Sequence, residues 1–273
     1  MIRTVKCESW MRFISTVRRS AGYGDRYFRG HRDRSWKLSS PAERRLAAMQ
    51  GNGIRVGNPG DERAAMRRFK EAEVAAFRRH AVGIPSFDST SFSNLDWMAL
   101  ARHHGVVTPL LDWTKSPYVA AWFAITDELS QANPAIKSDP FFAPLTLGSA
   151  SVAVWELQFS QAPWALEEFE LLVDRHALQH RQKAQHAAFT RLDHPEFFDL
   201  QSYLEHRGSE SCLSVYEVSL NAAQVAIAVT DLDLMGINFA TMYPDLYGAA
   251  LAANTEPLYK DTRELLEKFP GID

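Results

Sequence analysis

The segment LLDWTKSPYVAAWFA, residues 110–124, restricts the fold of this chain more than any other stretch. Residues 108–111 predict a short extended run. Ser116-Pro117 predicts a helix start, because Ser is a preferred N-cap and Pro is tolerated at the first helical position. The residues that follow are apolar on most sides, which predicts a buried helix. A polar Asp-Trp-Thr turn therefore joins a strand to a buried helix, where backbone N–H groups favour anions. Alternatively, Asp112 and Ser116 only cap the turn.

The composition is ordinary for a globular protein, with 46% hydrophobic and 23% charged residues in a chain of 273. No apolar run approaches the roughly 20 residues of a membrane-spanning helix, and the first 20 residues show no signal-peptide pattern. Two cysteines, Cys7 and Cys212, are too few for a four-thiolate zinc site or a disulfide framework. We therefore expect a cytoplasmic protein that does not enter a membrane.

The charges are divided unevenly along the chain. Residues 1–80 hold 19 Lys and Arg against 8 Asp and Glu, whereas the remaining residues hold 11 against 25. Such a division favours one face that binds a polyanion, either nucleic acid or a phosphorylated ligand. The alternative is that the basic segment packs on the acidic one.

Hydrophobic periodicity and cap signals predict an α+β fold, with one mixed-sheet domain and an N-terminal helical part. The alternation of strands and helices that a doubly wound sheet needs is missing. We expect an N-terminal helix at 1–24, a main domain at 25–255 and a C-terminal helix at 256–273. The predicted strands are 27–30, 151–159, 186–192 and 211–220, and the predicted helices include 61–80, one capped by Ser93 or Asn94, 195–208, and one from Asn221 to Gly236.

The stretch DRYFRGHRD, residues 25–33, predicts a strand that ends in a sharp turn. Arg29 would present a planar guanidinium, which suits phosphate oxygens. Gly30 would leave room for a ligand against the backbone, and Arg32 and Arg34 add positive charge. Alternatively, the stretch is an exposed basic turn.

Histidines give no strong metal signal. His103 and His104 are adjacent on a predicted helix and point in different directions, so they do not suit one metal ion. His176 and His180 have the i, i+4 spacing of a metal pair, but no carboxylate pattern accompanies them, which favours an exposed helix face. We predict no metal site. The sequence also lacks the Walker, G-x-G-x-x-G, nucleophile-elbow and EF-hand motifs.

Four segments together resemble the FRG domain family, named for Phe-Arg-Gly. They are YFRGHRD with the following SWKLSSPAERR, then ALARHHGVVTPLLDWTKSPYVAAWFA, RQKAQHAAFT and GINFATMYPDLYGAA, and the resemblance runs from about residue 25 to 250. Two positions depart from the family pattern. Ala187 replaces a glycine, and Pro109 stands where arginine is common, which removes one possible phosphate contact.

A second resemblance, to ADP-ribosyltransferases with an Arg–Ser–Glu layout, implies a mechanism. Those enzymes carry an arginine on an early strand, a Ser-Thr-Ser segment before an apolar helix, and a glutamate on a later strand. The resemblance implies that the arginine holds the NAD pyrophosphate, a hydroxyl holds the ribose, and an aromatic ring stacks on the cationic nicotinamide. The residues implied are Arg29, Thr114, Ser116 and Gln185 for catalysis, and Arg29, Gly30, His103, His104, Asp112, Trp113 and Thr114 for NAD binding, with a structural role as the alternative for Asp112.

The glutamate of that layout has no clear counterpart. Gln185 stands at its position, and an amide cannot supply negative charge to an oxocarbenium-like ribose. Glu156 or Glu217, on neighbouring predicted strands, could supply that charge instead.

These resemblances imply an NAD-dependent ADP-ribosyltransferase, with NAD as substrate, that acts as a bacterial toxin or phage-defence effector. The basic N-terminal third favours a nucleic-acid acceptor, DNA first, and an antitoxin or immunity protein is the expected protein partner. One alternative is a non-catalytic nucleic-acid or nucleotide-binding module. Another is a metal-independent hydrolase or nuclease that uses His103 or His104 with Asp112. The residues expected to bind nucleic acid are Arg32, Arg34, Arg44 and Arg45.

Overall fold

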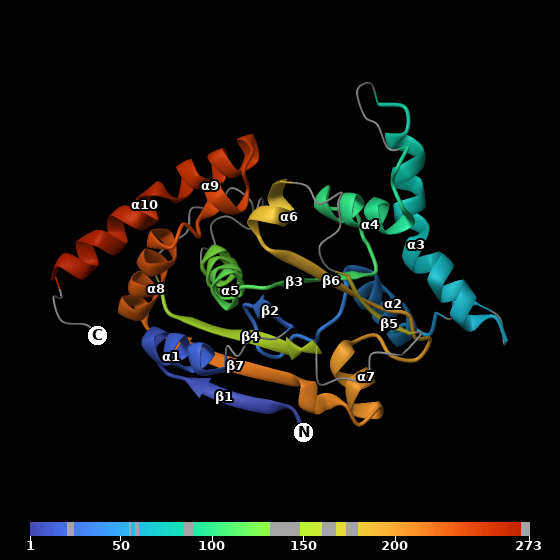
Figure 1. Cartoon of the computed structure of the whole chain (residues 1–273), viewed down its shortest axis with the longest axis horizontal. Coiled ribbons are helices and arrows are strands. Elements are labelled where there is room, and N and C mark those ends of the chain that lie inside the picture. Colours follow the sequence, from blue (N-terminus) through green and yellow to red (C-terminus); the bar gives the residue numbers. More distant parts are fainter. Residues whose placement is uncertain are drawn as a thin grey trace.

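An open mixed sheet of seven strands organises the described part of the chain (Figure 1). The computed structural model describes residues 1–20, 25–54, 56–57, 60–84, 90–131, 148–159, 168–172 and 180–268. The strand order is β1-β7-β4-β2-β3-β6-β5; β1 runs parallel to β7, and all other neighbours are antiparallel. The expected α+β fold with one mixed sheet is confirmed. The strands are β1 (Arg3–Cys7), β2 (Arg26–His31), β3 (Leu110–Thr114), β4 (Ala150–Gln158), β5 (Phe169–Leu172), β6 (Ala187–Leu192) and β7 (Leu213–Leu220).

The helices begin where the sequence offers capping side chains. Ser93 and Asn221 each accept a hydrogen bond from the third backbone N–H of the helix that follows. Ser116 Oγ accepts from Val119 N at 3.3 Å, which confirms the predicted cap. The helices are α1 (Trp10–Ser20), α2 (Pro41–Gly51), α3 (Glu62–Ala81), α4 (Asn94–His103), α5 (Pro117–Gln131), α6 (His180–Ala184), α7 (Leu200–His206), α8 (Ala222–Leu234), α9 (Phe239–Met242) and α10 (Leu246–Lys268), with a short 3₁₀ turn, η3 (Glu210–Cys212).

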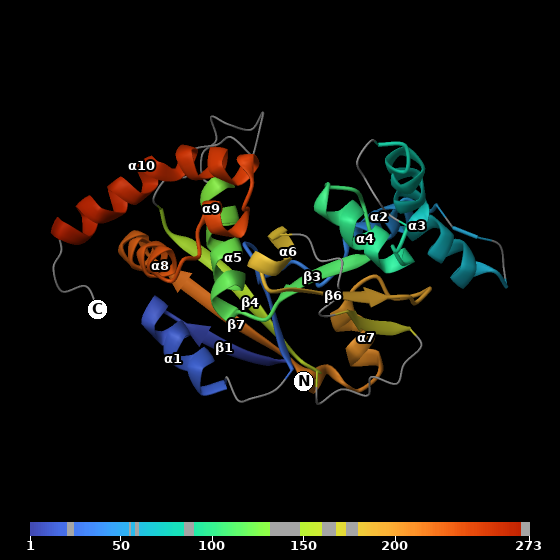
Figure 2. The same ribbon diagram turned by 45° about the horizontal axis from the view of Figure 1, so that its top comes forward.

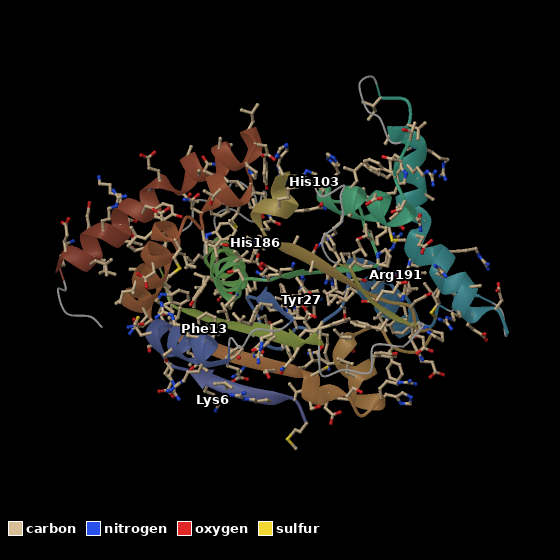
Figure 3. The ribbon with its side chains drawn as sticks, viewed as in Figure 1. Lys6, Phe13, Tyr27, His103, His186 and Arg191 are labelled. Carbon is tan, nitrogen blue, oxygen red and sulfur yellow. The ribbon has the colours of Figure 1, made fainter. Side chains whose placement is uncertain are left out.

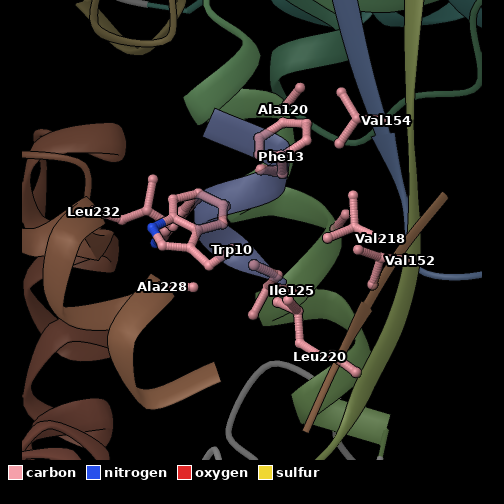
Figure 4. Close-up of a cluster of buried hydrophobic side chains, with 14 of the residues drawn as sticks. Trp10, Phe13, Ala120, Ile125, Val152, Val154, Val218, Leu220, Ala228 and Leu232 are labelled. Atoms are coloured by element: carbon pink, nitrogen blue, oxygen red, sulfur yellow. The ribbon is translucent and has the colours of Figure 1, made fainter. Parts of the chain in front are cut away.

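Apolar side chains cover both faces of the sheet. On one face, α1, α5 and α8 pack around Trp10, Phe13 and Ile125, with α5 lying over β2 and β4 (Figures 2 and 4). On the other face, the core includes Tyr203 of α7. A third cluster includes Trp97 of α4 and joins α3 and α4 to the sheet. None of the helices in these ranges is long and apolar enough to cross a membrane.

Three predicted boundaries differ from the structure. The first residues form β1 before α1 begins, because pairing with β7 (Arg3 opposite Ser214) holds them extended. Within 195–208, only Leu200–His206 is helical, since the Asp199 side chain caps the helix there. At the other end, α10 starts at Leu246 and continues through the expected boundary at 255.

Candidate functional site

Arg29 fills the space where β2 and β3 separate. One register pair, Phe28 opposite Thr114, joins the two strands. Beyond that pair, Arg29 Nη1 donates to the Asp112 backbone O at 2.8 Å and lies 3.5 Å from the carboxylate Oδ2. Arg29 Nε donates to His31 Nε2 at 2.9 Å. The structure therefore brings Arg29 beside the Asp-Trp-Thr segment.

Arg102 on α4 binds the same carboxylate. Its Nε donates to Asp112 Oδ1 at 3.1 Å and its Nη2 to Oδ2 at 2.6 Å. The two side chains are 28% and 35% exposed. Arg44 on α2 is a third guanidinium, close enough for its charge to act on Arg29. We call Arg29, Arg44, Arg102 and Asp112 the arginine cluster.

The arginine cluster carries more positive than negative charge. Burial lowers the pKa of Arg29 to about 10, with Asp112 opposing this shift and Arg102 and Arg44 adding to it. Burial and the charge of Arg102 also lower the pKa of Arg44. Burial alone would raise the pKa of Asp112, but Arg102 and Arg29 hold it below its ordinary value. The arginine cluster thus holds one ionised carboxylate and three cations, and the neighbouring Glu43 carboxyl also acts on Arg44.

The hydroxyl groups expected to hold ribose form hydrogen bonds within the protein. Thr114 Oγ1 donates to Gln185 O at 2.7 Å and accepts from Ser116 N at 3.1 Å. The Gln185 side chain donates through Nε2 to Met242 O at 3.0 Å. The structure therefore brings Thr114, Ser116 and Gln185 together, and their polar atoms join β3, α5 and α9.

Trp113 lies away from the arginine cluster. Residues 112–114 belong to β3 rather than to a turn, so Asp112 and Thr114 face one side and Trp113 the other. The indole is 3% exposed, packs in the core with α7, and donates through Nε1 to Thr190 Oγ1 at 2.9 Å. The expectation that Trp113 stacks on nicotinamide is therefore wrong.

Residues 24–133 match the FRG domain family. The matched residues make up less than half of the chain, and they are similar to an FRG domain. All four residues of the arginine cluster lie in the matched region. The two later segments that resemble the family, 181–190 and 236–250, lie beyond it. Comparisons with curated proteins and with solved structures give no match.

The three residues that name the FRG domain have separate structural roles. Phe28 packs in the core under α5, and Arg29 belongs to the arginine cluster. A Cβ at Gly30 would lie 1.9 Å from the Ala120 backbone O, so the glycine allows α5 to lie directly on β2. The expectation that Gly30 leaves room for a ligand is wrong, because α5 occupies that space.

The rings of His103 and His104 contact each other edge to face, with centroids 4.9 Å apart, so the expectation that they point apart is not confirmed. The His104 ring stacks on Phe77, with centroids 5.8 Å apart. His103 lies at the end of α4 (Figure 3), where burial and then the charge of Arg181 lower its pKa. Gln182 Nε2 donates to Ala99 O at 3.2 Å and joins α6 to α4.

An aromatic group from the C-terminal part of the chain lies near the matched region, and the sequence argument missed it. Arg181 Nε donates to Asp245 Oδ2 at 2.5 Å, and its guanidinium lies 5.1 Å and 5.0 Å from the ring centroids of Tyr243 and Tyr247. Burial raises the pKa of Tyr243 to about 12, and Asp112 is close enough to contribute. The family-like segment MYPDLYG was the available signal for these residues.

Most of the arginines expected to bind nucleic acid pair with acids. Arg32 Nε lies 3.4 Å from Asp127 Oδ2, and Arg34 Nη1 lies 3.5 Å from Glu217 Oε2. Arg45 pairs with Glu73, whereas Arg44 belongs to the arginine cluster. Two of these acids, Asp127 and Glu217, lie beyond the basic segment, which supports packing of the basic segment on the acidic one.

The alternative carboxylates lie outside the arginine cluster. Glu156 is buried and accepts hydrogen bonds from Arg26 and the Tyr216 hydroxyl. Glu217 pairs with Arg34. Among the described residues, no three His, Cys, Asp or Glu side chains gather as metal ligands; His176 falls outside those residues.

Proposed function

We propose that this chain binds NAD at the arginine cluster and transfers its ADP-ribose to a nucleic acid. The excess charge of the arginine cluster carries the proposal, because Arg29 and Arg102 share the Asp112 carboxylate and Arg44 adds a third positive charge close enough to act on both. Partly buried cations without a counter-ion are costly, and a pyrophosphate would supply both negative charge and acceptor oxygens. A bound pyrophosphate would stabilise the charged form of Arg29 most, because burial already disfavours that form and lowers its pKa.

The proposed reaction breaks the bond between nicotinamide nitrogen and ribose C1′, with the electron pair leaving on nicotinamide. An acceptor oxygen or nitrogen then bonds to C1′ and loses its proton. The arginine cluster would hold the pyrophosphate during this step. Because Trp113 is buried, we assign no aromatic side chain to the nicotinamide ring.

A second candidate function, nucleotide binding without turnover, is favoured by Gln185. Its amide carries no charge and is held by the Met242 backbone O at 3.0 Å. A site without a free carboxylate at that position would bind NAD and leave the glycosidic bond intact. The two functions share the arginine cluster and differ in turnover.

Calorimetry with NAD, ADP-ribose and inorganic pyrophosphate tests the binding step shared by both functions. Arg44→Gln should weaken all three by roughly tenfold, because it removes one charge-assisted contact. Arg45→Gln is the matched control, since its neighbouring guanidinium on α2 faces Glu73 and Phe69 instead. Equal affinities for the two variants, or no binding by the wild-type chain, would contradict the proposal.

A further inference from the structure

Trp36 is an aromatic side chain that the proposed NAD site does not use. It lies between β2 and α2 and is 40% exposed, which is more than any other Phe, Tyr or Trp among the described residues. A turn fixes its position. The Asp33 carboxylate accepts from Ser35 N at 2.8 Å, and Trp36 N donates to Asp33 O at 3.2 Å. The indole is thus presented on an ordered turn.

One basic group lies over this indole, and a second precedes it closely in the chain. The Arg32 guanidinium lies 4.7 Å from the ring centroid, within cation–π range, and Asp127 holds Arg32 at 3.4 Å. Arg34, two residues before Trp36, has a side chain that is 66% exposed. We call Arg32, Arg34 and Trp36 the Trp36 platform. Because Arg32 lies over one face of the ring, a base would stack on the opposite face, with these arginines near its phosphates.

A chain of contacts joins the Trp36 platform to the arginine cluster. The Trp36 and His31 rings meet edge to face, with centroids 6.0 Å apart. His31 is buried, and its Nε2 accepts from Arg29 Nε at 2.9 Å. Arg29 in turn contacts Asp112. A ligand on the indole would therefore lie one buried side chain away from Arg29.

We propose that the Trp36 platform stacks one unpaired base of a single-stranded nucleic acid, with Arg34 contacting its phosphates. A duplex keeps both faces of each internal base covered, so only a single strand offers a face to the indole. This inference rests on the proposed function, because it identifies the acceptor class as single-stranded nucleic acid. The stacking itself needs no NAD.

Fluorescence anisotropy with a labelled ten-nucleotide single strand, as DNA and as RNA, tests the inference without NAD. Trp36→Ala should weaken binding about tenfold, Trp36→Leu equally, and Trp36→Phe less, because only the last retains an aromatic face. Arg34→Gln should reduce the slope of affinity against salt by about one phosphate contact.

Two outcomes would overturn the inference: Trp36→Ala that binds the single strand as tightly as wild type, or a duplex of the same sequence that binds more tightly. Trp36→Ala that loses single-strand binding and retains the wild-type NAD affinity would support it. Because NAD binding is measured separately, failure of the Trp36 platform and failure of the NAD proposal give different results.

Discussion

Gly30→Ala is the perturbation whose cost follows most directly from the structure. The new Cβ would lie 1.9 Å from the Ala120 backbone O and 3.0 Å from the Ala124 Cβ. An ordinary carbon–oxygen contact is ~3.3 Å, so α5 would have to move by about 1.4 Å. Overpacking a close-packed interior costs roughly 1–3 kcal/mol, and a shift of backbone falls at the upper end. We expect Gly30→Ala to lower the free energy of unfolding by about 3 kcal/mol.

Urea denaturation of Gly30→Ala beside Gly51→Ala measures this cost. Gly51 ends α2, and a Cβ there meets nothing within 4 Å. Gly51→Ala should therefore change the free energy of unfolding by less than about 1 kcal/mol, towards stability. If Gly30→Ala stays within about 1 kcal/mol of wild type, the packing argument is refuted.

Three further predictions follow from charged side chains. Asp112→Asn leaves Arg102 and Arg29 without their shared carboxylate. After allowing for solvent screening, we expect urea denaturation to show a free energy of unfolding lower by about 2 kcal/mol, partly restored by added pyrophosphate. An unchanged free energy of unfolding would contradict this. Burial raises the pKa of Glu43 to about 7, although Lys70 opposes the shift, whereas the unfolded chain loses this proton near 4.5. Wild type should therefore lose up to roughly 3 kcal/mol relative to Glu43→Gln as the pH rises from about 5 to 7, and parallel stability curves would show that the carboxyl is ionised throughout. If the chain is a toxin, its expression should slow bacterial growth and Arg29→Ala should not; equal toxicity would remove the role assigned to Arg29.

Local elements could be predicted because the signals that set them are local. Ser93, Ser116 and Asn221 cap helices whatever they pack against, and their side chains do so here. The alternation of residues 211–220 likewise predicts β7, because one face of that strand is buried. The cap at Asp199 is a local signal of the same kind, and it sets the start of α7 at Leu200.

The arginine cluster could be predicted only in part, because its members meet through tertiary packing. Arg29 and Asp112 stood out by their motifs, whereas Arg102 and Arg44 converge on them only once α4 and α2 lie against the sheet. β1 depends on pairing with residues more than 200 positions away. The burial of Trp113 is predictable from the sequence, because residues Leu111 to Thr114 alternate between apolar and polar and so place Trp113 on the apolar face.

The departure from the family pattern at Ala187 has a simple structural explanation. The residue with left-handed backbone there is His186, with φ of 49°, and Ala187 already belongs to β6. Alanine at 187 therefore needs no glycine-like conformation.

Release of nicotinamide from NAD by the purified chain tests the central claim most directly. The assay compares wild type with Arg44→Gln and Arg45→Gln, each alone and with single-stranded DNA, duplex DNA or RNA. We predict release that depends on a single strand, persists in Arg45→Gln and falls at least about tenfold in Arg44→Gln. If a chain that binds NAD releases no nicotinamide with any polymer, the transferase proposal is contradicted. Nucleotide binding without turnover then remains, and the uncharged Gln185 amide explains the missing turnover.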